Sequence, residues 1–170
     1  MELSLPATTD KEAIFTAVGK HLAGLSLGIA SVDAGRPWGG FFVMDESQTD
    51  DFVAEYFSDY DGDISRGGRL SPKILVVSPG ARLSWQYHDR REELWKVIHG
   101  PVGVCISPND DLPDPKPVGE GETVQFGTGI RHRLIGLDGW GVVAEIWQHT
   151  DPELPSDESD IVRVQDDYGR

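Results

Sequence analysis

Four side chains in the second half of the sequence could together bind one metal ion. Gln86 and His88 are two residues apart, Glu93 follows five residues after the histidine, and His132 lies farther along the chain. Their amide, imidazole and carboxylate groups are the mixed nitrogen and oxygen donors that suit Zn, Mn, Fe or Co. Because only Glu93 is anionic, a bound divalent ion would keep a net positive charge and act as a Lewis acid on a substrate oxygen.

Short strands are the elements expected to position these donors. Alternation along a strand at residues 81–88 would place three polar side chains on one face, namely Ser84, Gln86 and His88. A hairpin over residues 89–92 would then bring Glu93 opposite the histidine. A strand at 123–126, followed by a glycine-rich turn, would lead to His132. The alternative interpretation is a buried polar cluster held by hydrogen bonds alone.

The rest of the chain predicts a mainly β protein. A capping-box pattern that begins at Thr9 predicts a helix over residues 9–25, and a second short helix is expected at 47–57. From Lys73 onward the apolar period changes to two, which indicates strands at 73–77, 81–88, 93–98, 102–106, 122–126, 132–137 and 141–148. The final ten residues alternate again and are expected to pack back on the sheets. Many short strands separated by turn residues predict an antiparallel sandwich or barrel.

Length, composition and charge restrict the class of protein. The chain has 170 residues, of which 38% are hydrophobic, so it fits one domain with a substantial core. A formal net charge of -14 argues against nucleic acid and anionic membranes as partners. No run approaches the roughly 18 apolar residues of a membrane span, and no secretory signal is visible. The single cysteine, Cys105, fits a reducing compartment, so we expect a cytoplasmic protein.

The spacing of the four donors resembles that of the cupin family. The first cupin motif is matched at every interval by Gly80, Gln86, His88, Glu93 and Gly100, with Gln86 in place of the usual first histidine. The second motif is matched by Gly121, Gly129 and His132, whereas Gly127 and Gly136 stand where Pro and Asn are usual. The resemblance implies a single jelly-roll β-barrel at residues 36–170 behind a short N-terminal helical extension at 1–35. It also implies one divalent ion, zinc first, held by Gln86, His88, Glu93 and His132, and a possible homodimer.

Within the cupins, the chain is similar to the type II mannose-6-phosphate isomerases. The similarity rests on the segment Arg36-Pro37-Trp38-Gly39, on Lys73 seven residues before Gly80, on Arg91 two residues before Glu93, on His132-Arg133-Leu134, and on the stretch from Asp160 to Arg170. It implies a metal-dependent aldose–ketose isomerase that acts on a sugar phosphate, with mannose 6-phosphate as the leading candidate substrate. No part of the chain resembles the guanylyltransferase half to which such domains are often fused.

The resemblance also implies roles for individual residues. It implies that Lys73 and Arg91 are catalytic. It also implies that a small-molecule sugar phosphate is contacted by Arg36, Trp38, Ser84, Arg133 and Arg170. The base that would move the carbon-bound proton is left open between Lys73, Glu145 and His149. Two alternatives remain: another metal-dependent cupin enzyme, such as a free-sugar isomerase or a dioxygenase, and a sugar-binding cupin without catalysis.

Overall fold

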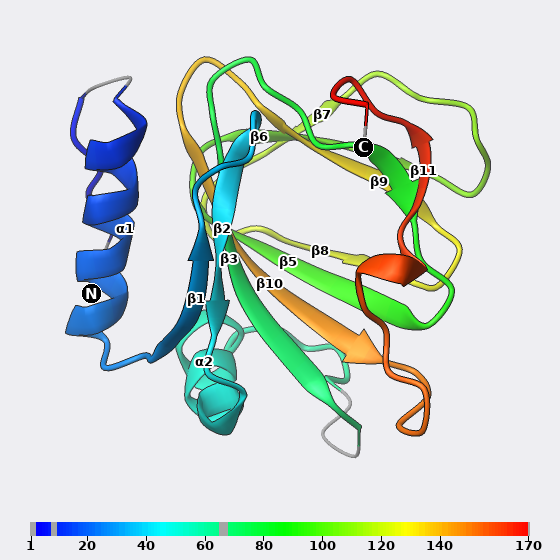
Figure 1. Cartoon of the computed structure of the whole chain (residues 1–170), viewed down its shortest axis with the longest axis horizontal. Helices are drawn as coiled ribbons and strands as arrows, with labels where there is room; N and C mark the ends of the chain where they lie inside the picture. Colours follow the sequence, from blue (N-terminus) through cyan, green and yellow to red (C-terminus); the bar gives the residue numbers. More distant parts are fainter. Residues whose placement is uncertain (1–2, 8–9, 65–67, 170) are drawn as a thin grey trace.

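The computed structural model consists mainly of two antiparallel β-sheets that face each other (Figure 1). It describes residues 3–7, 10–64 and 68–169. One sheet has six strands in the order β1-β2-β3-β10-β5-β8, and the other has five in the order β11-β4-β9-β6-β7. This arrangement confirms the expected mainly β jelly-roll barrel with a short N-terminal helix. Among the described residues, no helix is long and apolar enough to cross a membrane.

The elements follow one another along the chain with short connections. The helical elements are α1 (Lys11–Gly24), a 3-10 turn η1 (Glu46–Gln48), α2 (Thr49–Tyr56) and a second turn η2 (Glu158–Asp160). The larger sheet contains β1 (Ile29–Asp33), β2 (Gly39–Met44), β3 (Leu70–Val77), β5 (Arg91–His99), β8 (Thr123–Phe126) and β10 (Gly141–His149). The smaller sheet contains β4 (Trp85–Tyr87), β6 (Val102–Ser107), β7 (Lys116–Val118), β9 (Arg131–Gly136) and β11 (Val162–Gln165).

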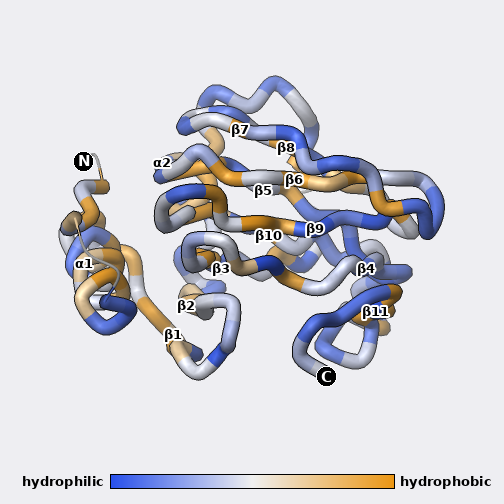
Figure 2. The backbone as a smooth tube through the Cα atoms, turned by 90° about the horizontal axis from the view of Figure 1, so that it is seen from above, coloured by the Kyte–Doolittle hydropathy of each residue, from blue (hydrophilic) through white to orange (hydrophobic). Residues whose placement is uncertain are grey.

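The N-terminal segment begins with α1 and ends in a strand of the larger sheet. Asp10 caps the helix by accepting a hydrogen bond from the Glu12 backbone N–H, one residue later than the predicted cap at Thr9, which lies outside the described residues. After the helix, β1 pairs with β2, so residues 1–35 contribute a strand to the barrel. Figure 2 shows α1 beside β1 and β2, at the end of the molecule opposite β4 and β11.

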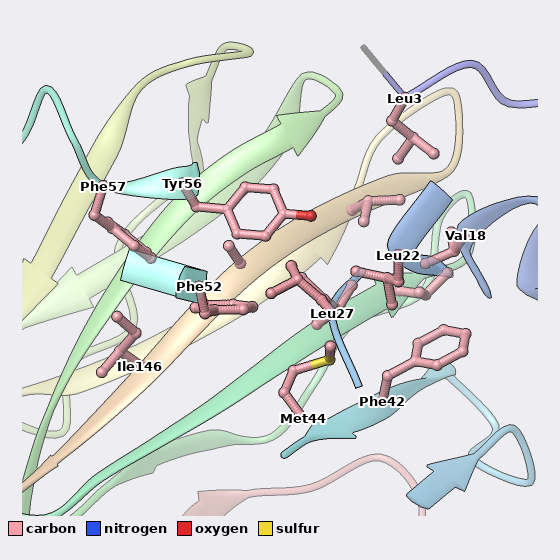
Figure 3. Close-up of a cluster of buried hydrophobic side chains, with 14 of the residues drawn as sticks. Leu3, Val18, Leu22, Leu27, Phe42, Met44, Phe52, Tyr56, Phe57 and Ile146 are labelled. Atoms are coloured by element: carbon pink, nitrogen blue, oxygen red, sulfur yellow. The ribbon is translucent and has the colours of Figure 1, made fainter. Parts of the chain in front are cut away.

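The outer face of the larger sheet carries an apolar core. Alternate residues of the central strands point outward, and those of β3, β5 and β10 are Ile74, Val76, Leu94, Val142, Ala144 and Ile146. The two helices cover them with side chains that include Val18 and Leu22 of α1 and Phe52 and Tyr56 of α2 (Figure 3). Phe52 and Ile74 are at most 1% exposed. Burial of this face therefore fixes the helices on the sheet.

The inner face carries a second core and the polar residues. Leu75, Val77, Trp95, Val97 and Val143 of the larger sheet pack against Val102, Val104 and Leu134 of the smaller one. All eight residues of β3 and all nine of β10 are buried, because helices cover one face and the second sheet covers the other.

Two expectations about the strands are wrong. Only Trp85–Tyr87 of the expected strand at 81–88 forms a strand with its neighbours, apart from one isolated bridge at Arg82. The expected hairpin does not form, because β4 pairs with β9 and β11 whereas the strand that carries Glu93 pairs with β10 and β8. His88 and Glu93 therefore meet across the gap between the two sheets, and not as neighbours in one ladder.

Gly136 shows why the second motif departs from the usual residue at that position. A Cβ atom added there would lie 2.0 Å from the backbone oxygen of Ser78, well inside van der Waals contact. The backbone oxygen of Gly136 also accepts a hydrogen bond from the N–H of Gly80. The absence of a side chain thus lets the turn before the first motif lie directly against β9.

Candidate functional site

Three of the four predicted metal ligands converge between the sheets. His88 follows β4, Glu93 lies in β5 and His132 in β9, and each side chain is at most 2% exposed. One ligand atom from each lies within 4.8 Å of the others. His88 Nε2 is 3.1 Å from one carboxylate oxygen of Glu93, and His132 Nε2 is 3.2 Å from the other. The carboxylate is therefore placed between the two imidazoles.

The His132 ring is oriented for coordination through Nε2. Its Nδ1 lies 3.0 Å from the backbone oxygen of Ile130, so in the neutral ring Nδ1 carries the hydrogen and Nε2 carries the lone pair. The ring stacks on Phe126 with centroids 4.6 Å apart and meets the edge of Trp95 at 5.4 Å. These two contacts hold the imidazole plane in place.

The polar atoms of this cluster fit a bound cation. Among the described residues, His132 Nε2 and Glu93 Oε2 have no hydrogen-bond partner although both are buried. Buried polar atoms are normally satisfied, and two lone pairs 3.2 Å apart need a proton or a metal ion beside them. Burial acts to raise the pKa of Glu93, but His88, Arg91 and His132 outweigh it and hold that pKa well below its usual range. An ionised carboxylate and two imidazoles form a donor set for a divalent ion.

Gln86, the fourth predicted ligand, lies beside this cluster. It is the register partner of His132 across β4 and β9. Its side-chain oxygen accepts a hydrogen bond of 2.6 Å from the hydroxyl of Ser84. Both Gln86 and Ser84 line the pocket described below, and the coordination of a metal by Gln86 stays a prediction.

Arg91 is in direct contact with the candidate ligands. Its Nε–H donates to Glu93 Oε1 at 2.7 Å, and its Nη2 lies 3.0 Å from His88 Nε2. The guanidinium also donates to the Ser156 hydroxyl and lies 3.5 Å above the centre of the Trp147 ring. Its side chain is 1% exposed. The resemblance implied a residue that faces substrate, whereas the structure places the guanidinium against the metal ligands as well as along the pocket wall.

A C-terminal segment holds the loop between His88 and Arg91. The carboxylate of Asp160 accepts hydrogen bonds from the backbone N–H groups of Asp89 and Arg90. The hydroxyl of Ser156 donates to the same carboxylate at 2.6 Å. This segment therefore clamps the backbone that carries one of the ligands.

A pocket opens from the cluster along the inner face of the larger sheet. Glu93, Lys73 and Glu145 are among the residues that line it. Lys73 Nζ lies 3.2 Å above the ring centre of Trp147, and Glu145 accepts a hydrogen bond of 2.9 Å from the Trp95 indole N–H. Burial raises the pKa of Glu145 to about 8. Burial also lowers the pKa of Lys73, against the opposing effect of Glu145.

Two arginines and two aromatic rings form the outer part of the pocket. Arg36 pairs with Asp33 at 2.7 Å and lies over the ring of Phe41, which stacks on Trp38. Arg163 lines the pocket as well. Arg163, Phe41 and Trp147 were not predicted from the sequence as site residues. Strand alternation would have identified Trp147, since it shares the face of Glu145 in β10.

Arg133 and His149 lie away from this pocket. Arg133 is buried at 1% exposure and donates to the backbone oxygen of Gln165, so it anchors β11 and does not line the pocket. Arg170 lies outside the described residues. His149 bonds with the Ser71 hydroxyl and accepts from the Ser156 N–H, which occupies both ring nitrogens. Of the three candidate bases, Lys73 and Glu145 line the pocket.

The family is decided by comparison with known sequences. Residues 44–166, well over half of the chain, match the profile of the family described as mannose-6-phosphate isomerase C-terminal. The chain belongs to this family. Solved structures show the same cupin fold: the capsular polysaccharide assembling protein CapF of Staphylococcus aureus (TM-score 0.53, 16% identity, 78% of this chain and 33% of that chain) and an oxalate decarboxylase of Bacillus subtilis (TM-score 0.52, 17% identity, 75% and 29%).

Relatives with curated names are larger proteins. The chain is 34% identical over 112 residues to mannose-1-phosphate guanylyltransferase ManC of Salmonella typhimurium, covering 63% of this chain and 21% of the relative. It is 31% identical over 125 residues to the alginate biosynthesis protein AlgA of Pseudomonas aeruginosa, covering 74% and 24%. The chain thus spans less than a quarter of the length of these relatives.

The expectation that the chain is an aldose–ketose isomerase is wrong on this comparison. ManC is named a guanylyltransferase, an enzyme that transfers a nucleotide, and neither ManC nor AlgA is named an isomerase. The coarser assignment holds: the chain is a cupin domain related to proteins of sugar metabolism. Ligand spacing specifies the barrel and the donor set, whereas the reaction depends on the residues around them.

Proposed function

We propose that the chain binds a phosphorylated sugar at a divalent metal ion in the inner pocket. The observation that carries the proposal is the convergence of His88, Glu93 and His132, with unpartnered lone pairs among the described residues, beside a pocket that contains Lys73 and Arg91. Gln86 is the proposed fourth ligand. Zinc is the first choice because it accepts this mixed donor set, and Mn, Fe or Co are the alternatives.

The metal would supply a Lewis acid for an oxygen of the sugar. The residues of the chain would do the rest of the binding. Lys73, Arg36 and Arg163 line the pocket and can donate to a phosphate. Phe41 and Trp38 line the pocket with aromatic rings against which the C–H groups of a sugar can pack. The names of the relatives make mannose phosphates the first ligands to test.

Calorimetry on zinc-loaded protein tests this proposal with mannose 6-phosphate, mannose 1-phosphate and mannose. At least one phosphorylated sugar should bind more than about tenfold more tightly than mannose, because hydrogen bonds between charged groups contribute more than neutral ones. His132→Ala should lose both the metal and the sugar phosphate. Equal affinity for mannose and its phosphates, or protein that binds no divalent metal, would refute the proposal. The sugar should be recovered unchanged, and formation of a ketose phosphate would show that the pocket does more than bind.

A further inference from the structure

We infer that Arg91 is an internal cation that competes with the metal for its ligands. The inference rests on the proposed metal site and concerns how that site is filled. The guanidinium bridges two of the three candidate ligands, with Nε–H on Glu93 Oε1 and Nη2 on His88 Nε2. Both contacts have normal hydrogen-bond lengths, 2.7 and 3.0 Å, so Arg91 occupies the lone pair of His88 Nε2 and one of the two lone pairs of Glu93 Oε1.

His88 is the residue at which the two roles exclude each other. A neutral imidazole nitrogen has a single lone pair, so Nε2 can accept an N–H or bind a metal but cannot do both. A carboxylate oxygen has two, so Glu93 Oε1 can keep its bond to Arg91 Nε. His88 Nε2 is also the nitrogen that faces Glu93, at 3.1 Å. Metal coordination by His88 therefore requires the Nη2 end of Arg91 to move.

That movement shifts the guanidinium as a whole, because its three nitrogens form one rigid plane, so its contacts with Ser156 and Trp147 must adjust with it. Nη1 donates to the Ser156 hydroxyl at 2.8 Å, and the guanidinium plane stacks on Trp147. Arg91 also lines the pocket, so an Nη2 group that leaves His88 faces the space of the ligand. A phosphate in that space would hold Arg91 away from His88. Metal and sugar phosphate should therefore bind cooperatively, and reciprocally so.

The alternative interpretation is that Arg91 orients the metal ligands from outside. It predicts that replacing Arg91 changes the zinc affinity in the opposite direction. Removal of a residue that orients metal ligands weakens metal binding about 10–100-fold. Removal of a competitor strengthens it. The test is the zinc dissociation constant, measured by competition with a chromogenic chelator, for the wild type, Arg91→Gln and Arg91→Lys. Circular dichroism shows which variants fold. The lysine variant keeps the charge beside buried Glu93 but has no fork that can bridge two atoms.

We expect both Arg91 variants to bind zinc at least about tenfold more tightly than the wild type, as loss of a competing charge-assisted hydrogen bond predicts. Arg82→Gln is the matched control: the Arg82 side chain bonds to Asp167 and not to the ligands, so the zinc affinity of this variant should not change. Mannose 6-phosphate should tighten zinc binding in the wild type and do so less in the Arg91 variants.

The outcomes separate this inference from the proposed function. A wild type that binds no zinc refutes the metal site itself. Zinc binding in the wild type together with equal or weaker binding in Arg91→Lys overturns the competition while leaving the site intact. If Arg91→Gln does not fold, the lysine variant decides alone.

Discussion

The two faces of the six-stranded sheet are built from the same strands but differ in chemistry. On the outer face, β3, β5 and β10 present aliphatic side chains to α1 and α2. On the inner face, the alternate positions of the same strands carry Lys73, Glu93 and Glu145 beside apolar residues. Both faces are buried, so the difference is not one of exposure to solvent.

The comparison shows where the barrel tolerates buried charge. Every charged group on the inner face contacts another polar group or a ring: Arg91 with Glu93, Lys73 over Trp147, and Glu145 with the Trp95 N–H. A buried charge without such contacts would destabilise the fold strongly. The outer face needs no partners of this kind, and we expect it to provide most of the stability. The inner face contributes the binding chemistry.

The largest expected effect comes from removal of an aromatic side chain from the outer face. Phe52→Ala should lower the free energy of unfolding by about 3–5 kcal/mol, because Phe52 is 1% exposed in the apolar core and its removal leaves a cavity. Urea denaturation measures the loss. Zinc affinity of the folded variant should stay at the wild-type value, and a changed affinity would show that the two faces are coupled.

Glu145 on the inner face should make the free energy of unfolding depend on pH. The pKa of Glu145 is raised from 4.5 to about 8, so between these values the folded protein keeps a proton that the unfolded chain has lost. The unfolded state then binds fewer protons, and the contribution of Glu145 to stability falls as pH rises through this window. Metal-free wild type should therefore lose stability from pH 5 to pH 8 relative to Glu145→Gln.

Urea unfolding in the presence of EDTA, at a series of pH values, gives this difference. His21, His88 and His149 have lowered pKa values in both proteins, and their opposite contributions cancel when the two curves are subtracted. A difference that does not vary with pH would mean that Glu145 is ionised in the folded protein.

Two lysines on opposite faces give a matched pair for ligand binding. Lys73→Met on the inner face should weaken binding of a sugar phosphate by about tenfold, because it removes a charged donor from the pocket. Lys96→Met, in β5, removes a cation that pairs with Asp59 outside the pocket. The affinity of this variant for the sugar phosphate should equal that of the wild type. Calorimetry on zinc-loaded proteins measures both. Equal losses would indicate a general effect of charge and not a contact.

The smallest effect is expected on the exposed side of the smaller sheet. Arg82 and Asp167 form a hydrogen-bonded ion pair, but their side chains are 46% and 38% exposed. Exposed pairs contribute less than about 1 kcal/mol, so Arg82→Ala should change the unfolding free energy by less than that. A larger loss in urea denaturation would show that β11 depends on this pair.

Much of the barrel could be predicted from the sequence because the strands of both cores alternate clearly. The three strands that were missed, β1, β2 and β7, lack this signal: the residues of β1 are mostly exposed, β2 begins with two glycines, and β7 has only three residues. The N-terminal helix was predicted to within two residues at its start, although its capping residue was not.

The convergence of His88, Glu93 and His132 could also be predicted, since fixed intervals along the chain reflect fixed positions in the barrel. The path by which His88 and Glu93 meet could not, because a short connection between strands can form a hairpin or cross between sheets, and the residues at 89–90 do not distinguish these. The contact of Arg91 with the ligands was equally hidden. A side chain with several rotatable bonds can reach in more than one direction, and only the packing of Trp147 and Ser156 selects one.

The bonds from Asp160 to the loop after His88 have a consequence for the order in which the protein is made. Asp160 follows the residues whose backbone it binds by 71 and 70 positions. On the ribosome, the loop that carries a metal ligand is therefore synthesised long before the carboxylate that holds it. Every barrel strand except β11 also precedes Asp160 in the chain, so the loop gains this support late in synthesis.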